Sequence, residues 1–142
     1  MIKHILIPYD QSEPANRALE FAIDLAKKYA AKISVVACIV PQVPMDPTFG
    51  KSYAETLELM RQNAVAAVSI VESRIDELKM PVKTEVLVGV SIIDELLSYA
   101  ESHEVDLIVM GSRGLGGFKK LLLGSVASGL SQHSKCPVLI VK

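Results

Sequence analysis

The chain has 142 residues, of which 50% are hydrophobic and 22% are charged, and its formal net charge is −1. This composition is typical of a globular protein, and the length predicts a single domain over residues 1–142 that buries its core without disulfides or a structural metal. The balanced charge argues against nucleic acid as a partner, because binding along a phosphate backbone requires an excess of basic residues.

The N-terminal sequence and the cysteines predict a cytoplasmic protein with no membrane partner. The segment "MIKHILIPYD" turns polar after a few residues, unlike a secretory leader, and no apolar run approaches the length of a membrane span. Cys38 and Cys136 lie in apolar runs and form no CxxC pair, so we expect two buried thiols in a reducing compartment. The histidines show no metal-ligand spacing, and we expect His4 and His133 to be structural or exposed.

Five apolar segments of strand length alternate with segments of helical periodicity. The expected strands are 4–9, 33–40, 82–88, 105–110 and 137–141, and the expected helices are 14–30, 52–79, 91–102 and about 120–133. The first two helices carry apolar stripes that each predict one buried face. These stripes are Ala18, Leu19, Ala22, Leu25, Ala26 and Tyr29 in the first helix, and Leu57, Met60, Ala64, Val68, Val71, Ile75 and Leu78 in the second.

This alternation predicts an α/β fold with a doubly wound, five-stranded parallel sheet and helices on both faces. The third strand alternates apolar residues with Lys83 and Glu85, which is typical of an edge strand. Right-handed crossovers then predict the strand order 3-2-1-4-5. In such sheets a ligand binds beyond the carboxyl ends of the strands where the order reverses, which here lies between strands 1 and 4.

The sequence after strand 4 concentrates glycine: "VMGSRGLGGFKKLLLGSVA", residues 109–127, holds five of the eight glycines. Glycine permits tight turns and close approach to backbone N–H groups, and a following helix N-terminus attracts anions, so the segment is suited to a phosphate. For Gly111, Gly114 and Gly124 to face one anion, residues 115–123 must loop out and return, with the last helix beginning near Gly124. The alternative is a continuous helix from about Phe118, in which Gly124 is a packing residue and Ser125 a surface hydroxyl.

Several other residues have both a ligand role and a structural one. Asp10, at the end of strand 1, either faces the ligand or caps the helix that starts near Pro14, and both hold if Ser12 is the cap. Arg113 and the pair Lys119–Lys120 either reach phosphate oxygens or are solvated cations. The segment 40–52, rich in proline, either lies over the crevice as a lid or connects two elements.

A resemblance makes the ligand more specific. Gly-Ser-Arg-Gly, nine residues and then Gly-Ser resembles the Gly-2x-Gly-9x-Gly-Ser/Thr motif of the ATP-binding branch of the universal stress protein family. The segments "HILIPYDQSEPANRALEFAIDLA", "VDLIVMGSRG" and "CPVLIVK" resemble the family's first strand and helix, fourth strand and final strand, in the same order. No P-loop or dinucleotide fingerprint competes with this motif.

The resemblance implies a site for ATP, with Mg²⁺ or Mn²⁺ accompanying the nucleotide. Asp10 would contact ribose or base, the main chain of Cys38 would meet the adenine, and Met110 would pack on the nucleoside. The sequence departs from the family pattern at Ala37, where a histidine is usual, and at Ala127, where some relatives have threonine. The nucleotide-binding residues so implied, with Arg113 included, are Pro8, Tyr9, Asp10, Cys38, Met110, Gly111, Arg113, Gly114, Gly124, Ser125 and Val126.

These features predict a nucleotide-dependent regulatory or stress-response protein whose occupied and empty states are read by an unidentified protein partner. A slow ATPase and an interaction module that binds no nucleotide are the alternatives. No glutamate or histidine near 109–127 is placed to orient water, so we expect at most weak hydrolysis. The last strand, 137–141, is apolar on both faces at a sheet edge, and pairing with a second copy would cover it, which predicts a homodimer.

Overall fold

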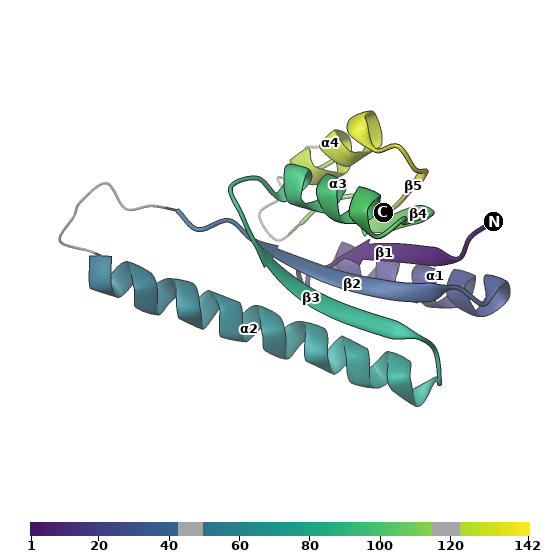
Figure 1. The fold of residues 1–142 in the computed structure, drawn as a ribbon, viewed down its shortest axis with the longest axis horizontal. Helices are drawn as coiled ribbons and strands as arrows, with labels where there is room; N and C mark the ends of the chain where they lie inside the picture. Colours follow the sequence, from purple (N-terminus) through teal and green to yellow (C-terminus); the bar gives the residue numbers. More distant parts are fainter. Residues whose placement is uncertain (43–49, 115–122) are drawn as a thin grey trace.

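The computed structural model describes residues 1–42, 50–114 and 123–142, with the backbone alone for 50–52. Residues 43–49 of the expected loop, and Lys119 and Lys120, lie outside the described residues. Strands and helices alternate in the predicted order (Figure 1). The elements are β1 His4–Pro8, α1 Glu13–Tyr29, β2 Lys32–Ile39, α2 Gly50–Glu77, β3 Val82–Val88, α3 Ile92–Ser102, β4 Leu107–Gly111, α4 Ser125–His133 and β5 Val138–Val141.

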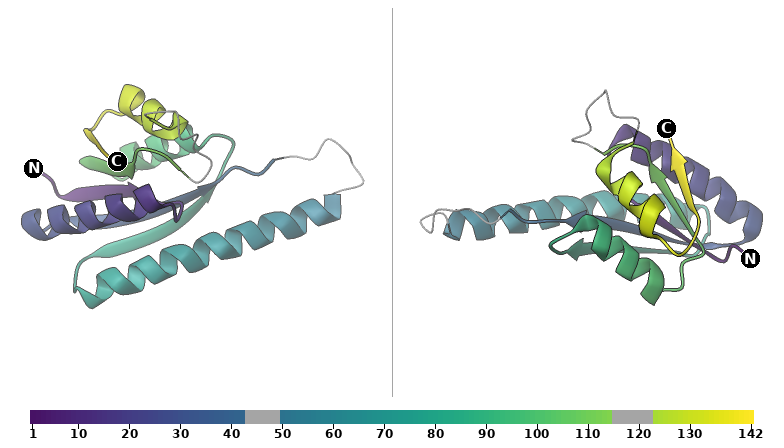
Figure 2. Two further views of the ribbon diagram at one scale, coloured as in Figure 1. Left: turned by 180° about the vertical axis from the view of Figure 1, so that it is seen from behind. Right: turned by 90° about the horizontal axis from the view of Figure 1, so that it is seen from above.

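The strands form one parallel sheet in the order β3-β2-β1-β4-β5, as predicted. The helices lie on both faces of this sheet: α1 and α2 on one, α3 and α4 on the other (Figure 2). Alternate residues of β1 supply the two cores, since Ile5 and Ile7 pack under α1 and α2 whereas Leu6 packs under α3 and α4. The edge position of β3 confirms what its alternating sequence predicts.

Helix α1 follows directly from its sequence. The hydroxyl of Ser12 accepts a hydrogen bond from the backbone N–H of Ala15 at 3.2 Å, which caps the first turn, and Ala30 ends the helix in the left-handed conformation with φ 54°. The predicted apolar stripe is buried at Ala18, Leu19, Ala22 and Ala26 and partly buried at Leu25. Tyr29 is 47% exposed, so its predicted place on the buried face is wrong, and its ring lies near the ammonium group of Lys28.

Helix α2 is too long for the sheet beneath it. Its 28 residues span about 42 Å, whereas the eight residues of β2 span about 26 Å. Val68, Val71 and Ile75 are buried as predicted. Met60 is 43% exposed because the N-terminal half of α2 extends past the sheet (Figure 1). Leu78 is 41% exposed and lies after the last residue of α2, so the prediction of one buried face along the whole expected helix is wrong.

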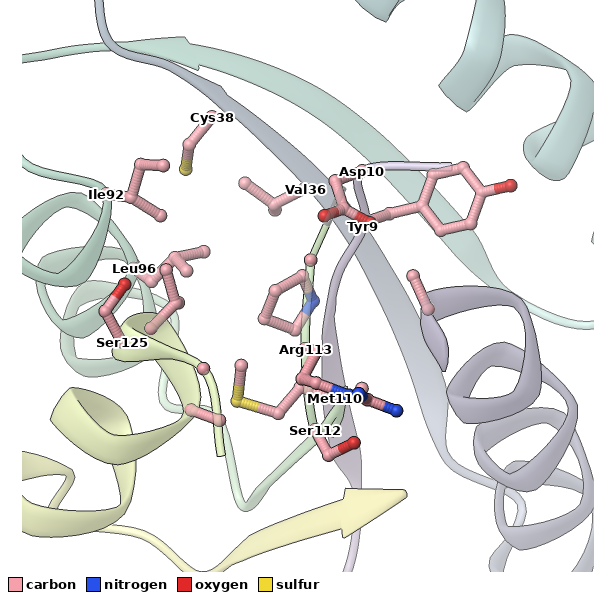
Figure 3. Close-up of a pocket in the computed structure, with 17 residues that line it drawn as sticks. Tyr9, Asp10, Val36, Cys38, Ile92, Leu96, Met110, Ser112, Arg113 and Ser125 are labelled. Atoms are coloured by element: carbon pink, nitrogen blue, oxygen red, sulfur yellow. The ribbon is translucent and has the colours of Figure 1, made fainter. Parts of the chain in front are cut away.

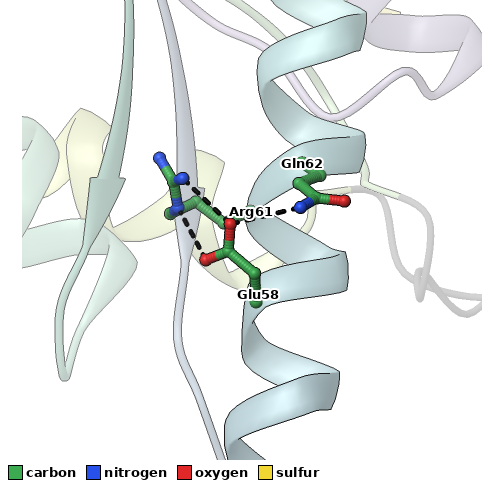
Figure 4. A network of polar contacts seen from close by, with 3 residues as sticks. All are labelled: Glu58, Arg61 and Gln62. Atoms are coloured by element: carbon green, nitrogen blue, oxygen red, sulfur yellow. Dashed lines mark hydrogen bonds and ion pairs between the residues drawn. The ribbon is translucent and has the colours of Figure 1, made fainter.

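The overhanging part of α2 carries a polar network on its surface (Figure 4). Arg61 donates to both carboxylate oxygens of Glu58, through Nε at 3.1 Å and Nη2 at 3.0 Å, and the Gln62 amide donates to the same carboxylate at 3.3 Å. Contacts between residues three and four apart support a helix locally, so this part of α2 relies on its own side chains where it lacks a sheet to pack against.

Candidate functional site

The carboxyl ends of β1 and β4 border a cavity of about 590 Å³ at the position that the strand order predicts (Figure 3). Its walls come from the end of β1 and the following loop, from β2, from the start of α3, from the end of β4 and from the start of α4. All eleven residues of the predicted site line this cavity. The other lining residues are Ala15, Val36, Ile92, Leu96, Ser112 and Ala127.

One end of the cavity is apolar. Val36 and Cys38 project from β2, and Ile92 and Leu96 project from the first turns of α3 toward them (Figure 3). Burial raises the pKa of the Cys38 thiol to about 12, with a smaller contribution from the negative charge of Glu95. The thiol is therefore protonated at neutral pH and serves as an apolar wall.

The main chain of Cys38 supplies the polar groups at this end. The N–H of Tyr9 donates to the carbonyl of Val36 at 2.9 Å, whereas the N–H of Gly89 donates to the carbonyl of Ile39 at 3.0 Å. Carbonyls along a strand alternate between its two neighbours, so the N–H and C=O of Cys38 point to the same side as those of Val36. Strand β1 ends at Pro8, so this donor and acceptor face the space beyond β1, where the cavity lies.

The other end is built by the return of the chain after β4. The N–H of Gly124 donates to the carbonyl of Ser112 at 2.6 Å, and α4 begins at Ser125 with Gly124 extended at φ −70° and ψ 165°. A continuous helix through Gly124 from Phe118 is therefore excluded. The first N–H groups of α4, at Ser125 and Val126, belong to residues of the cavity wall, and a helix N-terminus carries partial positive charge.

The glycines serve close approach rather than unusual backbone angles, because no described glycine has a positive φ. A Cβ on Gly111 would lie 2.7 Å from the carbonyl carbon of Pro14 and 2.9 Å from the nitrogen of Ala15, so Gly111 lets β4 end against the start of α1. A Cβ on Gly114 would lie 2.6 Å from Oδ2 of Asp10. Gly111 thus joins two elements, and Gly114 leaves room for a carboxylate.

The sequence left open whether Asp10 caps α1 or faces the ligand, and the structure assigns the cap to Ser12. Ser12 caps α1, and Oδ1 of Asp10 accepts from the backbone N–H of Ser12 at 3.0 Å while Asp10 lines the cavity. Gln11 between them has a φ of 66°, a conformation uncommon for a residue with a side chain. The cap and the cavity-facing carboxylate therefore coexist in one turn.

Tyr9 and Arg113 both line the cavity, but their side chains differ in direction. The Tyr9 ring points away from the cavity toward α1 (Figure 3), where its hydroxyl donates to Oδ1 of Asn16 at 2.7 Å. Burial raises the pKa of Tyr9, and the charge of Asp10 raises it further. Arg113 is half-buried and, with Asp10, makes up the charged side chains among the described lining residues. The polar end of the cavity therefore holds one charge of each sign.

The apolar wall was not predicted, although its signals are present in the sequence. Val36 precedes Cys38 by two residues, which places both side chains on the same face of β2. Ile92 and Leu96 are four residues apart and share one face of α3. The position of α3 over the end of β2 cannot be predicted from the sequence.

Neither a protein metal site nor a membrane helix is found in the part of the protein that the structure describes. Over residues 1–42, 50–114 and 123–142, no group of three or more histidine, cysteine, aspartate or glutamate side chains is arranged to hold a metal ion. Within these same ranges, no helix is both long and apolar enough to cross a membrane.

Comparison with known proteins covers the whole sequence. The universal stress protein MJ0531 of Methanocaldococcus jannaschii is 35% identical over 144 residues, which span 100% of this chain and 83% of that protein. The structure of the universal stress protein UspA from Lactobacillus plantarum superposes with a TM-score of 0.91 at 24% identity, over 99% of this chain and 98% of the other. This similarity of structure extends to all five strands.

Two more distant structures are described with nucleotides. A universal stress protein family member from Arabidopsis thaliana has AMP bound; it matches with a TM-score of 0.69 at 18% identity, over 99% of this chain and 91% of the other. A universal stress protein in complex with cAMP matches with a TM-score of 0.68 at 24% identity, over 99% and 96%. At these identities the likeness is one of fold. The sequence model of the universal stress protein family matches residues 1–142, and with the 35% identical relative this shows that the chain belongs to that family.

Proposed function

We propose that this universal stress protein binds an adenine nucleotide, ATP together with Mg²⁺ or Mn²⁺, and acts as a nucleotide-dependent regulatory protein. One observation carries the proposal. The hydrogen bond from Gly124 to Ser112 brings the N-terminus of α4 to the cavity that the main chain of Cys38 also faces. The main chain of Cys38 and the first N–H groups of α4 thus border one cavity, where the first would recognise a base and the second would bind an anion.

The Cys38 end suits adenine. The Watson–Crick edge of adenine offers an acceptor at N1 and a donor at N6, which complement one backbone N–H and one backbone carbonyl. Guanine presents a donor and an acceptor in the reverse order, so it would place like groups together. Ile92 and Leu96 provide apolar surface for the faces of the ring. The AMP and cAMP bound by two structural relatives support an adenine ligand.

The α4 end suits phosphate. The N–H groups in the first turn of α4 and the hydroxyl of Ser125 are donors on one part of the wall, and the guanidinium of Arg113 is a further donor that lies apart from Ser125 (Figure 3). The carboxylate of Asp10, also on the wall, would accept from ribose hydroxyls. The divalent cation would be held by phosphate oxygens and by the hydroxyl of Ser125, an oxygen ligand of the kind Mg²⁺ prefers, and it would neutralise phosphate charge.

Binding is favoured over hydrolysis. A residue that activates water must lie within hydrogen-bonding reach of the phosphates, and histidine or glutamate most often does this. Neither type is among the described lining residues, where Asp10 is the one acidic side chain. A bound nucleotide would therefore persist and alter the surface offered to a protein partner.

We further propose that two copies associate through β5. Leu139 in this edge strand is 36% exposed, and Val138 and Ile140 are partly exposed as well. An apolar edge strand that is left unpaired favours aggregation, and pairing with its symmetry copy would prevent this. The cytoplasm is the proposed compartment because Cys38 and Cys136 are both free thiols. Light scattering at micromolar concentration tests the dimer, and a monomer would contradict it.

Calorimetric titration with Mg·ATP and Mg·GTP tests the nucleotide proposal. We expect ATP to bind at least about tenfold more tightly than GTP, since a reversed hydrogen-bond pattern leaves buried polar groups unpaired. Ser125→Ala removes a hydroxyl from the phosphate end and should weaken ATP binding by about tenfold. Ser131→Ala makes the same change at the far end of α4, where the hydroxyl donates to the carbonyl of Ser128, and should leave affinity unchanged. Absence of ATP binding to the wild-type protein would overturn the proposal.

A further inference from the structure

A second set of polar side chains lies at the opposite edge of the sheet, where the strands begin. His4 is the first residue of β1 and is 4% exposed, and Ser34 of β2 and Tyr99 of α3 are 3% and 4% exposed. None of the three lines the cavity. They join β1 and β2 to the C-terminal half of α3, where Tyr99 follows Leu96 of the cavity wall by three residues.

The hydrogen bonds among these residues are all satisfied when His4 is neutral. Nδ1 of His4 lies 3.0 Å from the carbonyl oxygen of His103, which can only accept, so Nδ1 carries a proton. Nε2 lies 2.7 Å from Oγ of Ser34, and in the neutral ring it can only accept, so the Ser34 hydroxyl donates to it. Oγ of Ser34 accepts in turn from the hydroxyl of Tyr99 at 3.2 Å. Every donor in this series has an acceptor.

A second proton on His4 would break this match. The ring would then donate from both nitrogens, which with the hydroxyls of Ser34 and Tyr99 makes four donor hydrogens for the three contacts of the cluster. Ser34 and Tyr99 are too buried for water to take the surplus donor, and an unpaired buried donor is costly. The protonated ring would also place a charge between the sheet and α3.

The groups around His4 differ in their effect on its pKa. Burial is the largest influence and lowers the pKa from its ordinary value of 6.5, whereas the hydrogen bond to the His103 carbonyl opposes this. The positive charge of Lys32 on β2 and that of His103 at the end of α3 lower the pKa, and the carboxylate of Asp106, before β4, raises it. Burial prevails, in agreement with the neutral ring that the hydrogen bonds require.

We propose that His4 is a proton-sensitive latch that ties α3 to the sheet through Ser34 and Tyr99 and loosens this link when the protein is acidified. The bond from Nδ1 to the carbonyl of His103, the C-cap of α3, remains in both forms of the ring because Nδ1 donates in both. The bonds of Ser34 are disturbed, since its hydroxyl donates to Nε2 of the neutral ring and its oxygen accepts from Tyr99 of α3. Loosening this link affects a helix whose first turns form part of the cavity wall. Any effect on nucleotide affinity rests on the proposed function, whereas the tests below use ligand-free protein and do not depend on it.

The first test is an NMR titration of the histidine rings in the wild-type protein. The exposed ring of His133 serves as an internal reference, and His133→Gln identifies its signal. We expect the His4 ring to titrate below 6.5. A His4 ring that titrates at or above 6.5 would overturn the latch.

The second test measures amide hydrogen exchange between pH 7.5 and 5, expressed as protection relative to the unfolded protein. The reporters are the N–H groups of Val105 and Asp106, which donate to the carbonyls of Ala100 and His4 at 2.9 Å each. We expect their protection to fall with the His4 titration, by up to about tenfold for each pH unit between the pKa values of the open and closed forms. The amide of Ile23 in α1 is the control and should not follow this titration.

His4→Gln separates the latch from a general loss of stability on acidification. Glutamine keeps a donor and an acceptor but does not titrate, so the pH dependence of protection at Val105 and Asp106 should disappear, whereas His133→Gln should retain it. Protection in the wild-type protein that stays constant through the His4 titration would refute the proposal, and this result can be obtained even if His4→Gln does not fold.

Discussion

The two edges of the sheet differ in how they use the backbone groups at strand ends. At the carboxyl edge, β1 and β4 stop beside a cavity of about 590 Å³, with the main chain of Cys38 and the first turn of α4 directed at its space. At the amino edge, protein groups satisfy the strand ends. The carboxylate of Asp106 accepts from the N–H groups of Lys3 and His4 at 2.8 and 3.0 Å.

This difference indicates that one edge of the sheet contributes mainly to stability and the other mainly to ligand binding. Groups that are paired inside the protein contribute to its stability, whereas groups left at the cavity are available to a ligand. Substitutions at the carboxyl edge should therefore change binding more than folding, and substitutions at the amino edge the reverse. The predictions below test this division, beginning with a residue that should violate it.

Gly111→Ala should give the largest effect, a loss of about 3 kcal/mol in the free energy of unfolding, although Gly111 lies at the cavity. Its new Cβ would lie under 3.0 Å from backbone atoms of Pro14 and Ala15. Backbone atoms cannot move aside as easily as the end of a flexible side chain, so the clash is costly. Urea denaturation measures the loss. Gly114→Ala is the matched control: it meets the rotatable carboxylate of Asp10 and should cost less than about 1 kcal/mol. Equal losses for the two variants would contradict this account.

Asp106→Ala should lower the free energy of unfolding by about 2 kcal/mol, because two backbone N–H groups lose a charged acceptor. ATP affinity should remain within about twofold of wild type, since the site is at the far edge of the sheet. Denaturation and calorimetry on the same samples measure both. Asp24→Ala, on the exposed side of α1, should leave both quantities unchanged, and a drop in affinity for Asp106→Ala would show that the edges are coupled.

The contribution of Asp106 should also depend on pH. The hydrogen bond from the Lys3 N–H is the main cause that lowers the Asp106 pKa below its ordinary value of 3.8. The unfolded protein therefore takes up this proton at higher pH than the folded one, so the stabilisation is present above pH 3.8 and is lost as the pH falls through the folded pKa. In Asp106→Asn, the part of the decrease in the free energy of unfolding at low pH that this carboxylate causes should be absent. An unchanged decrease at low pH would show that the carboxylate does not contribute to stability.

Glu20→Gln should give the smallest change in the free energy of unfolding. It serves as the reference for a contact that lies at neither edge of the sheet. Arg74 on α2 donates to Glu20 on α1 at 2.7 Å, but both side chains are about half exposed. The loss should be below about 1 kcal/mol and should diminish in 1 M salt, because solvent and ions screen exposed pairs. Denaturation at two salt concentrations measures it, and a larger, salt-independent loss would show that α1–α2 packing depends on this pair.

The fold was predictable because strand length and apolar continuity are local properties of the sequence. Where such a local signal is absent, the predictions were wrong or incomplete. The stripe in α2 extends through Met60 with the same periodicity as the buried part, and nothing local tells that the sheet ends before it. Tyr29 fits the apolar stripe of α1 by periodicity but is exposed, although Ala26 in the same turn is buried.

The candidate site was predictable to the extent that it lies at strand ends. Asp10 and Gly111 follow apolar runs, so their edge of the sheet could be assigned. The start of α4 could not, because the hydrogen bond that fixes it joins Gly124 to Ser112 across a segment that fits helical periodicity equally well. The His4 cluster was missed altogether, since its partners Ser34 and His103 are 30 and 99 residues away in the sequence.

The pairing of β1 with β4 has a consequence for how the protein is made. Ile5 pairs with Ile33 on one side, but its partner on the other side, Leu107, is synthesised about 100 residues later, or about 5 to 20 s at ordinary rates of translation. Until then the growing polypeptide exposes the apolar edge of β1. Because the cavity is lined by residues of both strands and of α4, a nascent polypeptide acquires its ligand site only after α4 has been synthesised, and nucleotide can stabilise the protein only from then on.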